Sequence, residues 1–292
     1  MNDINELLKR NNILGCKYKK NGKCIIVNNK DRNIVIKPNK TDIYEYLKYR
    51  NFNNYPDLYI DDGYEIMEYI EPVNIPREQK MIDLINVISS LHKKTTYYKK
   101  ISEFNIEDIY DKLKNKLNSI KIYYDKLVFD AENSIYMSPS SYLLVRNISS
   151  VYNMINLCES NIEKWYKNIK ETEKVRVSVI HNNLSLNHFI NNILISWDNS
   201  KIGLPIFDLY TLYINTYNEY DWNELLDIYM SNYPLKEDEL FLLYTLIGLP
   251  LKPSITNIEI DNVEEISEKL NYLKLSNDLI SKRKFEINKE SV

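Results

Sequence analysis

His181-Asn182-Asn183-Leu184-Ser185-Leu186-Asn187-His188-Phe189-Ile190 is the segment of this sequence that indicates the fold most strongly. Its first eight residues are mostly polar, and apolar, β-branched runs lie on either side of it, at 175–180 and 190–197. Two such runs joined by a polar segment are typical of a hairpin. We therefore expect a hairpin at residues 179–198, with the histidines and amides in its loop.

The residues before position 70 indicate a small β-rich region. Two β-branched runs, 24–27 and 34–36, are separated by polar turn residues and predict a first hairpin. Residues 41–50 have the spacing of a short helix. The runs 58–60 and 64–67 flank Asp-Asp-Gly, which predicts a second hairpin. The order is strands, helix, strands.

After position 70 the pattern becomes helical. Apolar residues recur at helical spacing in five stretches, with only the 179–198 hairpin between them: 81–91, 105–128, 141–170, 206–247 and 262–284. We therefore predict an α+β, bilobal chain. Residues 1–70 form a small β-rich N-lobe, and residues 71–292 form a larger, mostly helical C-lobe that contains the hairpin.

Composition excludes several classes of function. The 292 residues carry a formal net charge of −3 with both signs mixed, so nothing attracts nucleic acid in general. No stretch approaches the roughly 20 apolar residues of a membrane span. The first residues lack the basic-then-apolar order of a signal peptide, so we expect a cytoplasmic protein at synthesis, with no membrane insertion.

Three motifs in the second half of the chain resemble those of one superfamily. Residues 181–190 are similar to the catalytic loop of the aminoglycoside phosphotransferases and choline kinases, usually H-G-D-L-H-x-x-N-I-L. Ile195-Ser196-Trp197-Asp198 resembles their metal-binding strand, and Pro205-Ile206-Phe207-Asp208-Leu209 resembles their D-P-x-x-D-L segment. The resemblance implies a protein-kinase-like fold.

Two upstream motifs extend the resemblance. Residues 88–94 are similar to the A-x-x-L-H helix of the superfamily, and residues 34–37 are similar to the strand that bears its ATP-binding lysine. By this resemblance Lys37 contacts nucleotide, with Glu45 in the following helix as its partner. A surface ion pair between Lys37 and Glu45, with no nucleotide, is the equal alternative.

Within the superfamily, the second half of the chain is most similar to the CotS-type spore-coat proteins of spore-forming Firmicutes. Asp221-Trp222, the segment 233–240 and Leu246-Ile247-Gly248-Leu249-Pro250-Leu251 are the matching residues. The resemblance implies a role in sporulation, a location in the spore coat, and other spore-coat proteins as partners.

The catalytic positions depart from the pattern of the superfamily. Asn183 stands in place of the aspartate base, and an amide cannot accept a proton at neutral pH. His188 replaces an asparagine that binds metal, and Mg²⁺ prefers oxygen ligands. Ser196 replaces the principal metal-binding aspartate. These changes predict a degenerate site, a pseudokinase.

Two other roles follow from the resemblance and from position. His181 and Asp208 have structural roles in the loop. Asp198 is two residues beyond Ser196, so on a strand both would point to the same side, and Asp198 is the one candidate for a displaced metal ligand. The histidines lack the partners of a zinc site, and we expect no bound metal.

The sequence leaves three hypotheses for the function of this chain. The first is a degenerate kinase-like protein with a structural or interaction role and no cofactor. The second is an active phosphotransferase that uses ATP and Mg²⁺ on an alcohol group. The third is a binding module that holds a ligand in the same cleft without chemistry.

Overall fold

The computed structural model describes residues 2–11, 17–22, 24–28, 33–101 and 105–290. The chain divides into two compact units. The first contains Met1–Thr95 and Ser178–Gly203, and the second contains Thr96–Val177 and Leu204–Val292. None of the helices among the described residues has the length and apolar character needed to cross a membrane.

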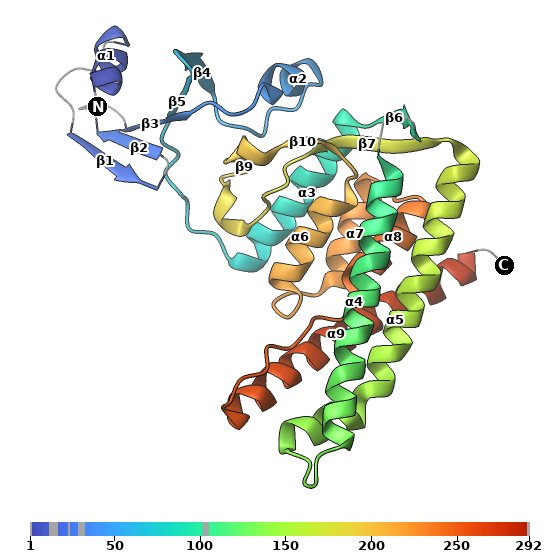
Figure 1. Cartoon of the computed structure of the whole chain (residues 1–292). Coiled ribbons are helices and arrows are strands. Elements are labelled where there is room, and N and C mark those ends of the chain that lie inside the picture. The colour runs from blue at the N-terminus through green and yellow to red at the C-terminus, as the bar shows by residue number, and fades with distance from the viewer. Residues whose placement is uncertain (1, 12–16, 23, 29–32, 102–104, 291–292) are drawn as a thin grey trace. The chain divides into compact units, whose positions relative to one another are not determined.

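A five-stranded antiparallel sheet forms the base of the first unit (Figure 1). The strand order is β1-β2-β3-β5-β4, and every neighbouring pair is antiparallel. The strands are β1 (Lys17–Asn21), β2 (Cys24–Asn28), β3 (Asn33–Pro38), β4 (Leu58–Asp61) and β5 (Tyr64–Glu68). Both expected hairpins pair as predicted, although turn residues 29–32 of the first lie outside the described residues.

The β4–β5 hairpin is tight because of its turn residues. Asp62 and Gly63 both have positive φ, 50° and 76°. A two-residue turn with both central residues in this region matches the twist of the strands, and Asp-Gly is a favoured pair for it. This turn fixes the register of β4 against β5, with Asp61 paired with Tyr64.

The helix α1 (Asn2–Arg10) supplies the core on one face of this sheet. Its Leu7 and Leu8 pack with buried apolar residues of the strands: Val27, Ile34, Ile36 and Ile66. Successive strand residues point to opposite faces, so Lys37 lies on the other face from Ile36. Neither α1 nor β1 was predicted from the sequence.

Two helices and the loop region complete the first unit. The helices are α2 (Ile43–Tyr49) and α3 (Arg77–Thr95), close to their predicted positions. The segment after position 178 contains the end of β7 (Lys174–Ile180), η2 (Leu186–His188), β8 (Phe189–Ile190), β9 (Ile193–Leu194), η3 (Trp197–Asn199) and β10 (Lys201–Gly203). The end of β7 pairs antiparallel with β10.

The loop segment differs from prediction in two ways. We expected one strand over 190–197, but positive φ at Asn191, Asn192 and Ser196 breaks it into short pieces. The boundary expected at residue 70 also placed this segment in the helical lobe. In the structure it packs with residues 1–95, where Leu194 N donates to Asn54 O at 2.9 Å and Asn191 Nδ2 donates to Glu71 O at 2.8 Å.

The second unit is built on one long helix pair. The helices α4 (Ile106–Glu132) and α5 (Pro139–Thr172) pack against each other, and α5 also packs on α8 and α9. Ser138 caps α5, with its Oγ accepting from Ser141 N at 3.2 Å and Pro139 following. The remaining elements are β6 (Tyr97–Lys100), the first residues of β7, α6 (Ile206–Thr216), α7 (Trp222–Asn232), α8 (Glu237–Gly248) and α9 (Glu259–Glu290).

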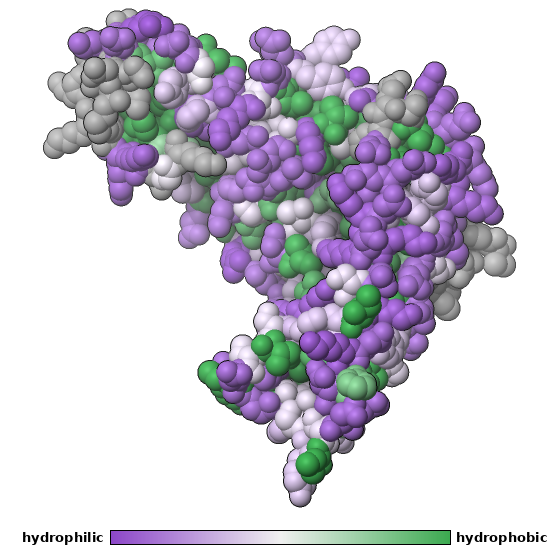
Figure 2. Space-filling model, in the orientation of Figure 1, coloured by the Kyte–Doolittle hydropathy of each residue, from purple (hydrophilic) through white to green (hydrophobic). Residues whose placement is uncertain are grey.

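Exposed apolar side chains gather in one region of the second unit. Of the fifteen large apolar side chains that are exposed among the described residues, nine lie at 122–142 and 255–260. Figure 2 shows apolar surface at the free end of the α4–α5 pair. The backbone N of Ser140 donates to Glu259 Oε1 at 2.7 Å, which brings the starts of α5 and α9 together at this end.

One buried side chain in α5 is expected to cost stability. Asn161 is fully buried, and neither of its amide atoms has a hydrogen-bond partner among the described residues. A buried polar group without a partner costs about 1–3 kcal/mol. We predict that Asn161→Leu, which is similar in size, raises the free energy of unfolding by about 1 kcal/mol or more. Urea denaturation measures it, with Asn153→Leu, exposed on the same helix, as the control. An unchanged or lower midpoint for Asn161→Leu would contradict the prediction.

Candidate functional site

The central contact of the first unit is an ion pair across two strands. Lys37 on β3 is directly opposite Glu65 on β5, and Lys37 Nζ lies 2.9 Å from Glu65 Oε2. Both residues are buried, with 6% and 0% of their surfaces exposed. Opposite charges at directly paired positions stabilise an antiparallel ladder. The register of β3 against β5 therefore creates this pair.

A second carboxylate reaches Lys37 from the loop. Asp198 Oδ1 lies 2.9 Å from Lys37 Nζ, and the Asp198 side chain is 27% exposed. Ser196 has a φ of 67° and precedes the single turn of η3, so Ser196 and Asp198 are not on a strand as we expected. The left-handed residue turns the chain and brings Asp198 to the lysine.

Charge within this cluster is unevenly balanced, because two carboxylates share one ammonium. Burial alone would lower the pKa of Lys37, but the hydrogen bonds to Asp198 and Glu65 outweigh it and hold the pKa above its ordinary value. Burial raises the pKa of Glu65, with Lys37 and Tyr44 opposing the shift. Lys37 is therefore firmly charged at neutral pH.

Two further side chains surround the cluster. Tyr44 on α2 donates its hydroxyl to Glu65 Oε2 at 3.1 Å, and burial raises the pKa of Tyr44, so this hydroxyl keeps its proton. Cys24 at the start of β2 is half-buried; burial raises the pKa of its thiol, and the charge of Lys37 opposes the rise. The cluster is thus tied to the sheet and to α2.

The partner expected for Lys37 was wrong. Glu45 is exposed on α2, and the buried carboxylate that pairs with Lys37 is Glu65. Tyr44, the residue before Glu45, faces the cluster instead. The helix that the spacing from Lys37 indicated, α2, does contact the cluster, but through Tyr44. Glu45 lies on the solvent side of that helix.

His181 holds the loop from inside. It is fully buried, and its Nε2 donates to Ile195 O at 2.9 Å. Its ring lies edge-on to the buried Trp197, with 4.9 Å between ring centroids. Trp197 in turn donates from Nε1 to Leu194 O and packs against Phe52. These contacts tie both ends of the loop to each other.

Asn183 and His188 lie at the open part of the loop and are half-buried. His188 Nδ1 lies 2.7 Å from the backbone oxygen of Asn183. A carbonyl only accepts, so Nδ1 carries the proton, and a neutral His188 keeps an unprotonated Nε2. From the sequence we considered His188 only as a poor magnesium ligand, and we missed this basic nitrogen.

The carboxylates nearest the loop are already engaged with Lys37. The described residues contain no cluster of three or more His, Cys, Asp or Glu side chains suited to a metal. Magnesium in such sites needs one or two carboxylates besides phosphate and water. Asp198 is one carboxylate, and it is already bound to Lys37.

The remaining motif residues lie in the second unit. Asp208 is fully buried in the first turn of α6. Asp221 caps α7, with Oδ1 accepting from Asn223 N at 2.9 Å. Glu239 forms a buried ion pair with Arg176, whose guanidinium lies 4.2 Å from the centre of the Tyr233 ring. These residues serve the packing of the helical unit.

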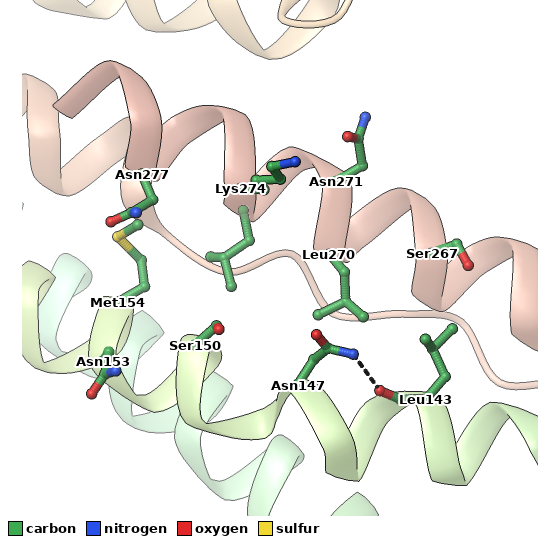
Figure 3. A pocket seen from close by; sticks show the side chains of 11 residues that line it. Leu143, Asn147, Ser150, Asn153, Met154, Ser267, Leu270, Asn271, Lys274 and Asn277 are labelled. Atoms are coloured by element: carbon green, nitrogen blue, oxygen red, sulfur yellow. Dashed lines mark hydrogen bonds between the residues drawn. The ribbon is translucent and has the colours of Figure 1, made fainter. Parts of the chain in front are cut away.

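A groove lies between α5 and α9 (Figure 3). This groove of about 520 Å³ has an apolar floor that includes Met154 and Leu273. Asparagine and serine side chains and one cation form its rim: Asn147, Ser150, Asn153, Ser267, Asn271, Lys274 and Asn277. It contains no carboxylate, histidine or cysteine, so it offers hydrogen bonds but no general base.

Comparison with known proteins identifies the fold of this chain. Sequence comparison matches no protein family model and finds no similar protein among curated ones. Comparison of structures matches an aminoglycoside phosphotransferase from Alicyclobacillus acidocaldarius with a TM-score of 0.66, at 8% identity, covering 91% of this chain and 92% of that one. The chain has the aminoglycoside phosphotransferase fold. The α+β kinase-like architecture predicted from the sequence is confirmed.

A second solved structure with this fold is a spectinomycin phosphotransferase in complex with ADP and spectinomycin. Its TM-score is 0.51 at 11% identity, and the match covers 95% of this chain and 98% of that one. Both matches span nearly the whole of each protein. At these identities the likeness concerns the fold and leaves the chemistry to be argued from the residues.

The buried ion pair gives a stability prediction. Lys37→Met leaves Glu65 buried without its cation, which typically costs about 3–5 kcal/mol. The double variant Lys37→Met/Glu65→Met removes both charges, and we expect it to recover most of that loss. Chemical denaturation of both variants checks this. A double variant as unstable as Lys37→Met would show that the pairing is not the source of the loss.

Proposed function

We propose that this chain is a pseudokinase, a kinase-fold protein that does not transfer phosphate and acts as a structural or interaction component. The observation that supports it most directly is at position 183. A phosphotransferase needs a carboxylate there to orient the substrate hydroxyl, and Asn183 has an amide. Loss of a central catalytic group commonly lowers the rate by about 10³–10⁶.

The state of Lys37 supports the same proposal. In a kinase site this cation contacts nucleotide phosphates. Here it is paired with Glu65 and Asp198, each at 2.9 Å. A phosphate must therefore compete with Asp198 for the ammonium, and the surplus carboxylate repels it. We infer that nucleotide binds weakly and does not need magnesium.

The spore-coat part of the proposal has a narrower basis. It rests on the likeness of Asp221-Trp222 and of residues 233–240 to CotS-type proteins. In this chain Trp222 and Tyr233 are buried and Glu239 pairs with Arg176, so these residues maintain the helical unit. A protein whose retained motifs serve packing fits a structural role, with other coat proteins as partners.

Removing Asp198 tests whether this side chain competes with phosphate. Asp198→Asn takes away the negative charge but keeps the size, so Lys37 becomes more available. We predict that ATP binds about fivefold more tightly to the variant in the absence of metal, a change of about 1 kcal/mol. Isothermal titration in EDTA measures it, with Asp57→Asn, an exposed carboxylate on the same unit, as control. Weaker binding by Asp198→Asn would mean that Asp198 supports nucleotide, contrary to the proposal.

Restoring the superfamily residues tests the assignment of the catalytic positions. The triple variant Asn183→Asp/His188→Asn/Ser196→Asp returns the base and the oxygen ligands. Aspartate tolerates the positive φ of position 196 better than most residues. We expect Mg²⁺-ATP to bind at least about tenfold more tightly than to the wild type, because Ser196→Asp adds a carboxylate and His188→Asn adds an amide oxygen for the metal. An affinity no better than that of the wild type would argue against the positions assigned to these three residues.

A second candidate function is favoured by one observation, the orientation of His188. With Nδ1 held by the backbone, Nε2 could take the proton of an acceptor hydroxyl while the hydroxyl oxygen bonds to the terminal phosphorus and the phosphorus–oxygen bond to the diphosphate breaks. An active phosphotransferase would then use ATP. ATP turnover that falls about 10²–10⁴-fold in His188→Gln would support this function over the pseudokinase.

A further inference from the structure

The second unit has two unusual surfaces at opposite ends of its long helix pair. We define the tip as residues 122–142 and 255–260. We define the lysine socket as Tyr98, Lys99, Lys100 and Lys174, which line a concavity of about 520 Å³. The socket is on β6 and β7, which directly precede α4 and follow α5, and the tip is where α4 ends and α5 begins.

Large apolar side chains lie exposed at the tip. Ile135 and Tyr136, between α4 and α5, are 93% and 90% exposed, and Phe129 is 65% exposed. Ile258 and Ile260 beside the start of α9 are also more than half exposed. Gathered exposed apolar residues commonly mark a protein interaction site.

The tip is also acidic. It contains four carboxylates, Asp125, Asp130, Glu132 and Glu259, against Lys126, a net charge of −3 that equals the net charge of the whole chain. Asp130 and Glu132, which flank the exposed apolar pair, are exposed and have no ion pair with any described residue. A partner for this surface must therefore be basic and must accept apolar side chains.

The lysine socket meets both requirements. Lys100 and Lys174 lie directly opposite each other across β6 and β7, and like charges at such positions destabilise the pair. Lys99, Lys100 and Lys174 have no ion pair among the residues that the structure describes, and no carboxylate lines the socket. Tyr98, 53% exposed, supplies an aromatic wall. The socket is large enough for a tyrosine side chain and lacks a counter-charge.

The two surfaces cannot meet within one molecule. The 27 residues of α4 separate them by about 40 Å, at 1.5 Å per helical residue. Figure 1 shows α4 and α5 side by side over this length. Contact between tip and socket therefore requires a second copy of the chain.

We propose that copies of this chain associate head to tail, with the tip of one copy seated in the lysine socket of the next. Ile135 and Tyr136 enter the socket, and Asp130 and Glu132 pair with Lys100 and Lys174. Such a contact uses different surfaces on its two sides, so it repeats and builds open chains or closed rings. The inference depends on neither nucleotide binding nor catalysis.

Complementation between two variants tests the proposal. The tip variant is Ile135→Ser/Tyr136→Ser, and the socket variant is Lys100→Glu/Lys174→Glu; all four side chains are at the surface, so the fold should persist. In sedimentation velocity at low salt the wild type should grow in size with concentration. Each variant alone should associate at least about tenfold more weakly. An equimolar mixture should form a dimer and nothing larger, because only one intact tip and one intact socket remain.

Matched controls separate this contact from general stickiness. Tyr49→Ser removes a tyrosine that is 80% exposed on α2, and Lys48→Glu/Lys93→Glu makes the same change of charge at residues that do not line the socket. Both should associate like the wild type. A wild type that stays monomeric at every concentration would overturn the proposal. A socket variant that still forms dimers alone would also overturn it, because that result indicates a tip-to-tip contact. A mixture of the two variants that forms no dimer would overturn it as well.

Discussion

A buried ammonium group is the constraint on which the first unit depends. Lys37 is almost inaccessible to solvent and lies 2.9 Å from each of two carboxylates, Glu65 and Asp198. A charged group in the interior must be paired, or its desolvation opposes folding. Three features of the fold therefore support the pairing. The register of β3 and β5 places Glu65 beside Lys37, the hydroxyl of Tyr44 on α2 bonds to Glu65, and the turn after Ser196 brings Asp198 to Lys37.

Contacts inside the loop and one contact to the sheet together hold the loop in shape. His181 and Trp197 hold the two ends of the loop by hydrogen bonds and ring packing, and none of these contacts involves the side chains of Asn183 or Ser196. Asp198 secures the loop to the sheet through Lys37. The shape of the loop therefore does not depend on the side chains of Asn183 and Ser196.

Much of the fold could be predicted from the sequence because its signals are local. Asp62-Gly63 defines the second hairpin, and the helix at Arg77–Thr95 follows from the spacing of its apolar residues. The short α1 offers little beyond Leu7 and Leu8, and its burial against the sheet is a tertiary effect. No local pattern in nine residues could have revealed that contact.

The site was harder to predict, because its contacts join residues distant in sequence. The partner of Lys37 depends on which strand lies beside β3, and that strand is β5, which is not adjacent in the chain. A resemblance based on spacing therefore pointed to Glu45 and missed Glu65. The position of Asp198 depends on positive φ at Ser196, an uncommon conformation for serine that the sequence does not announce. Local pattern identified the loop, and long-range packing decided what the loop contacts.

The most direct test of this account is the dependence of ATP affinity on magnesium in the unaltered protein. Isothermal titration with ATP in EDTA, and again with excess Mg²⁺, measures it. Because Asp198, the carboxylate that the loop offers to a metal, is already paired with Lys37, we predict weak binding and the same dissociation constant in both conditions. Binding that tightens tenfold or more with Mg²⁺ would contradict it, because the first unit would then contain a working metal site.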